Sequence, residues 1–223
     1  MEQVVTIKRK ALAANEERAD RLRSLFASAG TLVVNLISSP GSGKTTLLEE
    51  TVSALDGELS TAVLEGDVAT ENDANRIRAL GVPAHQILTG GACHLDARLV
   101  ETGLAAGGLP ETDILFIENV GNLICPTTYD LGEDFKVVLL SVAEGDDKPV
   151  KYPAIFARAE VAVITKADLL PHVPFDIDAV QERIASLNPD GDIIVTSALN
   201  GDGIATWLDL LRTRLEAKRR PQE

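Results

Sequence analysis

The chain of 223 residues has little cysteine, no long apolar run and few positive charges outside its ends. Its two cysteines, Cys93 and Cys125, are too few for the disulfide framework of a small secreted protein. No segment approaches the ~20 consecutive apolar residues of a transmembrane helix. The N-terminus lacks the apolar core of a signal peptide. We therefore expect a cytoplasmic protein with reduced thiols.

The shortage of positive charge lies in the middle of the chain. The net charge is −13, but residues 25–217 alone carry −17, whereas both ends are slightly basic. Nucleic-acid binding depends on dense contacts from Lys and Arg to phosphates. The sequence therefore predicts no nucleic-acid partner, and the absence of an apolar span predicts no membrane partner.

Apolar runs rich in β-branched residues recur along the chain, and helical segments lie between most of them. The runs are 31–38, 61–66, 83–89, 113–119, 135–142, 160–166 and 192–198. The helical segments are 1–24, 43–56, 71–80, 94–106, 176–187 and 203–219. Continuous apolar runs are typical of strands buried on both faces, and their alternation with helices indicates βαβ units. We predict an α/β fold with a doubly wound, mainly parallel sheet of about seven strands.

The segment SSPGSGKTT follows the first run and opens a helix, which is the context of a P-loop. Its candidate nucleotide-binding residues are Gly41, Ser42, Gly43, Lys44, Thr45 and Thr46. Backbone N–H groups would face the phosphates, Lys44 would reach the β- and γ-phosphates, and the Thr45 hydroxyl would bind Mg²⁺. Ser38 stands where a glycine is usual, and it can make the turn if its φ stays negative. The alternative is a Ser/Gly-rich loop that binds nothing.

The sequence TKAD closes the sixth run and resembles the guanine-specificity motif of GTPases. Asp168 could accept hydrogen bonds from the two donors that guanine has and adenine lacks, while the stem of Lys166 covers the base. Ser197 and Ala198 match the second guanine loop. Thr165 replaces the usual Asn, and we expect it to loosen the loop. The order of these motifs predicts GTP rather than ATP.

Two carboxylates at the ends of the second and fourth runs are suited to Mg²⁺ binding and catalysis. Glu118 ends the fourth run, and the N–H of Gly121 after it could sense the γ-phosphate. Asp67 exits the second run and could bind Mg²⁺ or orient the attacking water; the alternative is a helix N-cap. We predict Lys44, Asp67 and Glu118 as the catalytic residues. No residue stands out as a water-positioning Gln, so hydrolysis without a partner should be slow.

The two cysteines and one histidine form a candidate transition-metal site. Cys93 and His94 follow the third run, and Cys125 follows Gly121 by four residues. Two thiolates and an imidazole suit Ni²⁺ or Zn²⁺. Buried, inert thiols are the alternative. Since Cys125 and Gly121 share one short segment, nucleotide state would control metal affinity.

Six blocks of the sequence together resemble one known family. In order, they are SSPGSGKTTLLE, GDVATENDANRI, GGACHLDA, ENVGNLICP, EGDDKPVKYP and TKADLLP. They resemble the hydrogenase nickel-incorporation GTPase family, HypB. The resemblance implies a SIMIBI-class G domain over residues 30–217, after an N-terminal helical segment at 1–29 and before a tail at 218–223. It also implies a nucleotide-dependent homodimer, a small zinc-containing nickel chaperone as partner, and nickel delivery to the hydrogenase large subunit.

The resemblance also assigns residues. It places the metal site of Cys93, His94 and Cys125 at the dimer interface. Lys148 and Lys151 would lie near the dimer face and the γ-phosphate, and the alternative is that both are solvated loop charges. Leu169 and Val173 would be dimer contacts.

Three other functions remain open at this point. A urease-accessory nickel GTPase has a similar loop order but carries Cys-Pro-His in place of adjacent Cys93 and His94. A P-loop kinase would need a substrate lid, and we find no insertion large enough. A metal-binding protein with a vestigial nucleotide loop is disfavoured by the intact Lys44 and Thr45.

Overall fold

The computed structural model describes residues 2–67, 71–107 and 111–220. Residues 68–70 of the GDVATENDANRI block and residues 221–223 of the predicted tail lie outside the described residues.

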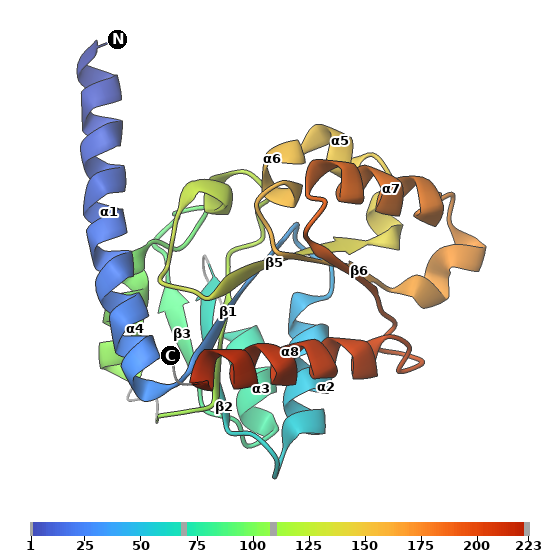
Figure 1. Cartoon of the computed structure of the whole chain (residues 1–223), viewed down its shortest axis with the longest axis horizontal. Helices are drawn as coiled ribbons and strands as arrows, with labels where there is room; N and C mark the ends of the chain where they lie inside the picture. The colour runs from blue at the N-terminus through green and yellow to red at the C-terminus, as the bar shows by residue number, and fades with distance from the viewer. Residues whose placement is uncertain (1, 68–70, 108–110, 221–223) are drawn as a thin grey trace.

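A sheet of seven parallel strands runs through the molecule in the order β3-β2-β4-β1-β5-β6-β7 (Figure 1). The strands are β1 Leu32–Ser38, β2 Thr61–Asp67, β3 Ala84–Leu88, β4 Ile114–Glu118, β5 Phe135–Ser141, β6 Val161–Thr165 and β7 Asp192–Val195. Each predicted apolar run corresponds to one of these strands, and β2 extends one residue beyond its run, to Asp67. Every residue of β1, β4 and β6 is buried, as expected for strands covered on both faces. The predicted parallel α/β fold is confirmed.

Helices cover both faces of the sheet (Figure 1). They are α1 Glu2–Ala29, α2 Lys44–Leu55, α3 Asn72–Ala79, α4 Ala97–Gly107, α5 Lys148–Lys151, α6 Pro153–Phe156, α7 Ile177–Leu187 and α8 Ile204–Arg219. Three short 3₁₀ segments are η1 Cys125–Thr128, η2 Val142–Glu144 and η3 Ala167–His172. Helices α2, α3 and α8 pack on one face, while α1, α4, α6 and α7 pack on the other. Buried Trp207 of α8 donates its indole N–H to Thr51 of α2 over 2.9 Å.

The predicted N-terminal helix is present as α1, and its two halves lie in different surroundings. The first turns project beyond the body of the molecule (Figure 1). In the second half, Ala19, Leu22 and Phe26 are buried in the cluster that also contains Val100 of α4. Asn15 accepts a hydrogen bond from Ala97 N over 2.8 Å and donates to Asp130 O over 2.8 Å. Helix α1 therefore packs against the segments that follow both cysteines.

Several element ends differ from the sequence expectation, among them the end of α1, at Ala29 instead of residue 24, and two others have a local structural setting. Helix α4 begins at Ala97 instead of residue 94, because the Asp96 carboxylate caps it by accepting from Leu99 N over 2.7 Å. Strand β7 ends at Val195 instead of residue 198. Beyond it, Ser197 pairs with Asp202 in an isolated bridge, which turns the chain before α8.

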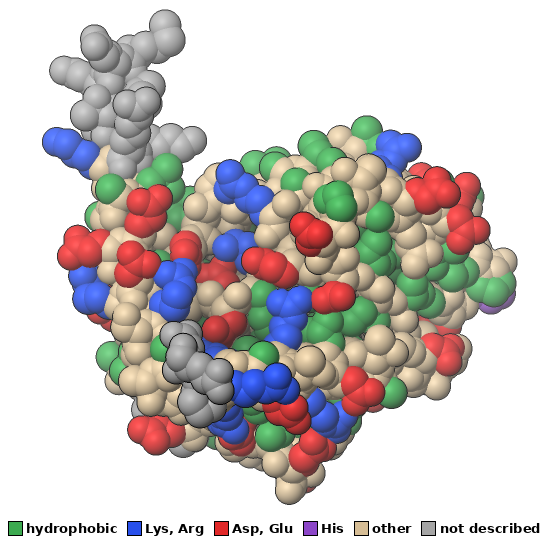
Figure 2. Space-filling view, in the orientation of Figure 1, with side chains coloured by type: hydrophobic (Ala, Val, Ile, Leu, Met, Phe, Trp, Pro, Cys, Tyr) green, Lys and Arg blue, Asp and Glu red, His purple; other side chains and the backbone are tan. Residues whose placement is uncertain are grey.

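The surface charge is mixed on the face shown in Figure 2, where Lys and Arg side chains are interspersed with Asp and Glu. Within the described ranges, no helix combines the length and apolar character needed to cross a bilayer.

Candidate nucleotide and metal site

All strands point the same way, so the loops after them gather at one edge of the sheet. A cavity of about 480 Å³ lies there, lined by the phosphate loop, the ends of β2 and β4, helix α3 and Lys166. A smaller cavity of about 190 Å³ adjoins it, lined among others by Gly43, Lys166, Asp168 and Ala198. Predicted phosphate-binding residues line the larger cavity, and predicted base-binding residues line the smaller one.

The phosphate loop adopts a conformation that glycine makes possible. Gly41 has φ 77° and Gly43 has φ 90°, both in the left-handed region. Gly43 is the N-cap of α2, so the first N–H groups of that helix face the cavity. Among the described residues, Lys166 is the only non-glycine with a positive φ, so Ser38 makes its turn with negative φ. Ser38 therefore substitutes for glycine without strain.

Lys44 and Thr45 point toward the same buried carboxylate. Lys44 Nζ donates to Ser38 Oγ over 2.9 Å and lies 4.0 Å from Glu118 Oε1. Thr45 Oγ1 donates to the same Glu118 oxygen over 3.0 Å. The three predicted residues therefore form one buried group at the end of β4.

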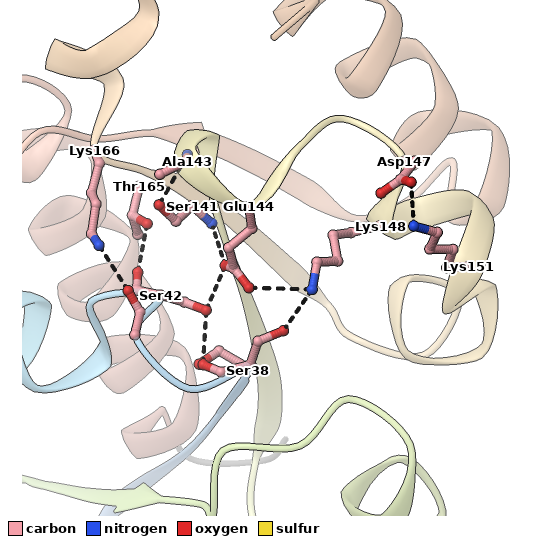
Figure 3. Close-up of polar contacts among 12 residues, drawn as sticks. Ser38, Ser42, Ser141, Ala143, Glu144, Asp147, Lys148, Lys151, Thr165 and Lys166 are labelled. Carbon is pink, nitrogen blue, oxygen red and sulfur yellow. Dashed lines mark hydrogen bonds and ion pairs between the residues drawn. The ribbon is translucent and has the colours of Figure 1, made fainter. Parts of the chain in front are cut away.

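Glu144 is a member of the site that sequence reasoning missed (Figure 3). Its carboxylate accepts from Ser42 Oγ over 2.6 Å and lies 3.4 Å from Lys148 Nζ. Lys148 Nζ also donates to Ser39 Oγ over 3.3 Å. Burial alone would raise the pKa of Glu144, but the hydrogen bonds from Ser42 and the backbone N–H of Ser141, with Lys148 nearby, lower it. The carboxylate and Lys148 thus form a charged pair beside the phosphate loop.

The predicted base loop is tied to the phosphate loop. Thr165 Oγ1 donates to Ser42 O over 2.6 Å, and Lys166 Nζ donates to Gly41 O over 2.7 Å (Figure 3). Thr165 therefore connects the two loops instead of leaving them loose. Ser197 Oγ donates to Asp168 Oδ1 over 2.7 Å and orients that carboxylate at the smaller cavity.

Three carboxylates converge on the floor of the larger cavity. Oxygens of Glu65, Asp73 and Glu118 lie within 4.8 Å of one another, and Asp67 lines the same cavity. Glu65 Oε2 and Glu118 Oε2 are buried without a hydrogen-bond partner in the described part of the chain. Burial, with Glu118, Asp73 and Asp67 nearby, raises the pKa of Glu65 to about 8. Burial raises the pKa of Glu118 to about 7 despite Lys44 and Thr45.

These two pKa values predict a pH-dependent stability of the nucleotide-free protein. Both lie above the ordinary value of 4.5, so the folded state binds more protons than the unfolded state. The free energy of unfolding should therefore fall as pH rises from about 4.5 to about 8. We expect Glu65→Gln to raise the thermal midpoint by at least about 4 °C at the upper end of this window and to change it little at the lower end.

Thermal unfolding followed by circular dichroism across this pH range tests the expectation. Glu50→Gln is the matched control, since Glu50 is exposed on α2. An equal shift of the Glu65→Gln midpoint at every pH would show that repacking, not ionisation, is responsible.

The two cysteines and His94 come together at the surface beside the larger cavity. The Sγ atoms of Cys93 and Cys125 lie 2.9 Å apart, and Cys93 Sγ lies 3.7 Å from His94 Nδ1. Ligand atoms of all three lie within 4.8 Å of one another. Burial lowers the pKa of His94, which favours the neutral imidazole that metals bind. The imidazole packs on Tyr129 with ring centroids 4.0 Å apart.

The segment from Gly121 to Cys125 joins the cavity to this cluster. A Cβ at Gly121 would lie 2.8 Å from Pro40 Cγ, so this glycine permits close contact with the phosphate loop. The next residue, Asn122, donates from Nδ2 to Cys93 O over 3.2 Å. The segment that approaches the phosphate loop therefore also contacts the Cys93 loop and itself carries Cys125.

The four residues that the resemblance places at the dimer face differ in exposure and contacts. Lys151 is exposed and pairs with Asp147, whereas Lys148 contacts the phosphate loop. Leu169 and Val173 are half-buried against the apolar cluster around α7.

The chain matches a family model described as CobW/HypB/UreG, nucleotide-binding domain, over residues 32–195. The hydrogenase maturation factor HypB of Escherichia coli (strain K12) is 50% identical over 200 residues, covering 90% of this chain and 69% of that protein. This chain belongs to the HypB family. Membership of this family of P-loop nucleotide-binding proteins implies nucleotide hydrolysis and disfavours the alternative of a small-substrate kinase.

Other HypB proteins extend the comparison. The hydrogenase/urease maturation factor HypB of Helicobacter hepaticus is 42% identical, covering 94% of this chain and 88% of that protein. The crystal structure of HypB from Helicobacter pylori in complex with nickel is 39% identical with a TM-score of 0.86, covering 94% of this chain and 99% of that one. The signal recognition particle receptor FtsY from Elizabethkingia anophelis is 14% identical with a TM-score of 0.56, covering 95% of this chain and 80% of that one. FtsY therefore shares only the fold with this chain.

Proposed function

We propose that this protein is a GTP-hydrolysing metallochaperone that couples nucleotide state to nickel delivery during hydrogenase maturation in the cytoplasm. One observation carries the proposal: the Gly121–Cys125 segment contacts the phosphate loop at one end and supplies a thiol to the Cys93, His94 and Cys125 cluster at the other. The names and the nickel complex of the HypB relatives support the same activity.

Mg²⁺ fits the residues at the cavity floor. Buried carboxylate oxygens without a partner among the described residues are suited to a hard divalent cation. Thr45, Asp67 and Glu118 would hold it, with Glu65 and Asp73 close by. When bound, Mg²⁺ would neutralise charge on the β- and γ-phosphates. Lys44, whose Nζ lies 4.0 Å from Glu118 Oε1, would add a fixed positive charge to the same site.

The proposed nucleotide is GTP because of Asp168. Its carboxylate, held by Ser197, can accept from both N1–H and the N2 amino group of guanine. Adenine has no donors at those positions, so the carboxylate would lose its partners. No Gln lines the larger cavity within the described ranges, so intrinsic hydrolysis should be slow.

Nickel is the proposed cargo of the Cys93, His94 and Cys125 cluster, and Zn²⁺ could use the same ligands. Three protein ligands leave one coordination position open for transfer. The proposed partners are a zinc-containing nickel chaperone and the hydrogenase large subunit. Adjacent Cys93 and His94, with Cys125 after the fourth strand, favour hydrogenase over urease as the enzyme served.

Nickel titration in each nucleotide state tests the proposal. We expect Ni²⁺ affinity to differ at least about fivefold between the GDP form and a form with a non-hydrolysable GTP analogue. Cys125→Ala should weaken binding at least about tenfold in either form, because it removes one of three ligands. His172→Ala is the matched control, since this exposed histidine lies outside the cluster. Unchanged affinity in Cys125→Ala would remove Cys125 from the site.

The proposed homodimer makes a separate prediction. A GTP analogue with Mg²⁺ should convert the monomer to a dimer in multi-angle light scattering. In the dimer, Lys148, Leu169 and Val173 are the proposed contacts, and the metal clusters of the two copies would face each other. Leu169→Asp should weaken association at least about tenfold, because the dimer would bury an unpaired charge. A monomer under saturating analogue would contradict this arrangement.

A further inference from the structure

The backbone N–H of Leu95 is held by a side chain that belongs to the nucleotide cavity. Leu95 is fully buried and directly follows His94 of the metal cluster. Its N–H donates to Oδ1 of Asn119 over 3.0 Å. Asn119 is 1% exposed, directly follows Glu118 and lines the larger cavity. One side chain therefore joins this cavity to the loop that carries Cys93 and His94.

A buried polar chain fixes the orientation of the Asn119 amide. Its Nδ2 donates to Asn35 Oδ1 over 3.3 Å, and Asn35 Nδ2 donates to Glu133 Oε1 over 3.1 Å. Glu133 also accepts from Leu131 N over 2.6 Å. All three side chains are buried, so an amide turned the other way would leave buried donors and acceptors without partners. The oxygen of Asn119 is thereby directed at Leu95.

The side chain of Leu95 makes a second contact with the cavity wall. A Cβ on Gly66 would lie 2.7 to 2.8 Å from Cγ, Cδ1 and Cδ2 of Leu95. Gly66 directly precedes Asp67 at the end of β2 and lines the larger cavity. Leu95 therefore fills space that any larger residue at position 66 would occupy, and it contacts the ends of both β2 and β4.

We propose that Asn119 and Leu95 form a positioning link through which the nucleotide sets the place of Cys93 and His94. The link deepens the proposed function and rests on it. Glu118 contacts Thr45 and Lys44, and the next residue along the chain holds Leu95. A shift of the β4 end is therefore transmitted to the Leu95 backbone, because packed buried groups move together.

This link follows a different route from the Gly121–Cys125 segment. That segment carries Cys125 and contacts Cys93 O through Asn122, whereas the link through Asn119 holds the backbone directly after His94. With both routes present, a single change at the end of β4 displaces all three ligands relative to one another. Metal affinity then responds more steeply to the nucleotide than it would through Cys125 alone.

Hydrogen exchange of the Leu95 amide tests the link without metal. In the metal-free protein, we expect the exchange rate to change at least about threefold when GDP is replaced by a non-hydrolysable GTP analogue. Asn119→Ala should speed exchange at least about tenfold and abolish this response. Val100→Ala is the matched control, since Val100 is fully buried on α4 in the same apolar cluster as Leu95. A Leu95 amide that does not respond in the unaltered protein overturns the inference.

Nickel affinity gives the second readout, measured at saturating nucleotide. We expect Gly66→Ala to reduce the ratio of Ni²⁺ affinities between the two nucleotide forms by at least about threefold, because its Cβ displaces Leu95. Gly103→Ala is the matched control: its Cβ would approach Ile87 to the same 2.7 Å, away from both sites. Where the unaltered protein shows a nucleotide-dependent ratio, a ratio that Asn119→Ala leaves unchanged overturns the inference.

The two readouts separate this inference from the proposed function. If the Leu95 amide responds to nucleotide but nickel affinity is equal in both forms, the proposed delivery function fails and the link stands. If nickel affinity depends on nucleotide and the Asn119→Ala variant keeps that dependence, the link fails and the delivery function stands.

Discussion

Replacing Lys44 with alanine will reduce nucleotide hydrolysis at saturating nucleotide at least about 100-fold. The ammonium group is buried, donates to Ser38 Oγ over 2.9 Å and lies beside the predicted position of the transferred phosphate. A preorganised charge in a site of low polarity stabilises the developing charge of the transition state far more than it would in water. Steady-state release of phosphate measures the loss.

The variant should remain folded, because Lys44 lines the cavity and is not part of the apolar clusters on either face of the sheet. Far-ultraviolet circular dichroism checks this point. Lys10→Ala, on the exposed part of α1, removes the same charge far from the cavity and serves as control. Hydrolysis within about threefold of the unaltered rate in Lys44→Ala would exclude this loop from the reaction.

Replacing Asp168 with asparagine will weaken GTP binding about 100-fold or more and improve binding of xanthosine triphosphate. Each hydrogen bond from guanine to the carboxylate contributes about 1.5 to 3 kcal/mol, and the amide can accept from only one of the two donors. Xanthine carries an oxygen where guanine has its amino group, so the amide nitrogen introduced by Asp168→Asn would donate to it. Equilibrium dialysis with the three triphosphates measures the change.

The amide oxygen at position 168 can still accept from Ser197 Oγ, so the loop should keep its shape. ATP binding is the internal control and should stay weak in both proteins. If the unaltered protein prefers ATP, the assignment of guanine is wrong. If the variant keeps full GTP affinity, Asp168 is not the residue that recognises the base.

Much of the fold and the phosphate loop could be predicted because their signals are contiguous. Most strands are short apolar runs, and residues 39–46 follow β1 directly. The cluster of Cys93, His94 and Cys125 could also be predicted, since parallel strands bring their carboxyl ends to one edge. The match to HypB proteins confirms the family that the six blocks indicated.

Contacts between neighbouring strands could not be predicted without the strand order. Glu65 is the one charged residue in its run, and nothing in the sequence states that β2 lies beside β4 and brings it to Glu118. Glu144 contacts Ser42 only because β5 lies beside β1. The contact of Asn119 with Leu95 likewise depends on tertiary packing across 24 residues of chain.

The strand order also determines when the phosphate loop can form during synthesis. Strand β1 pairs with β4 and β5, both of which come much later in the chain, and Ser38 is opposite Leu139. The ribosome therefore releases the loop long before its neighbours exist, and such non-local pairing folds slowly. A nucleotide can contact an assembled phosphate loop only after β5, which ends at Ser141, has emerged, and the proposed base-binding residues Asp168 and Ser197 emerge later still. It therefore acts on a sheet whose first five strands already exist and cannot guide the earliest steps of folding.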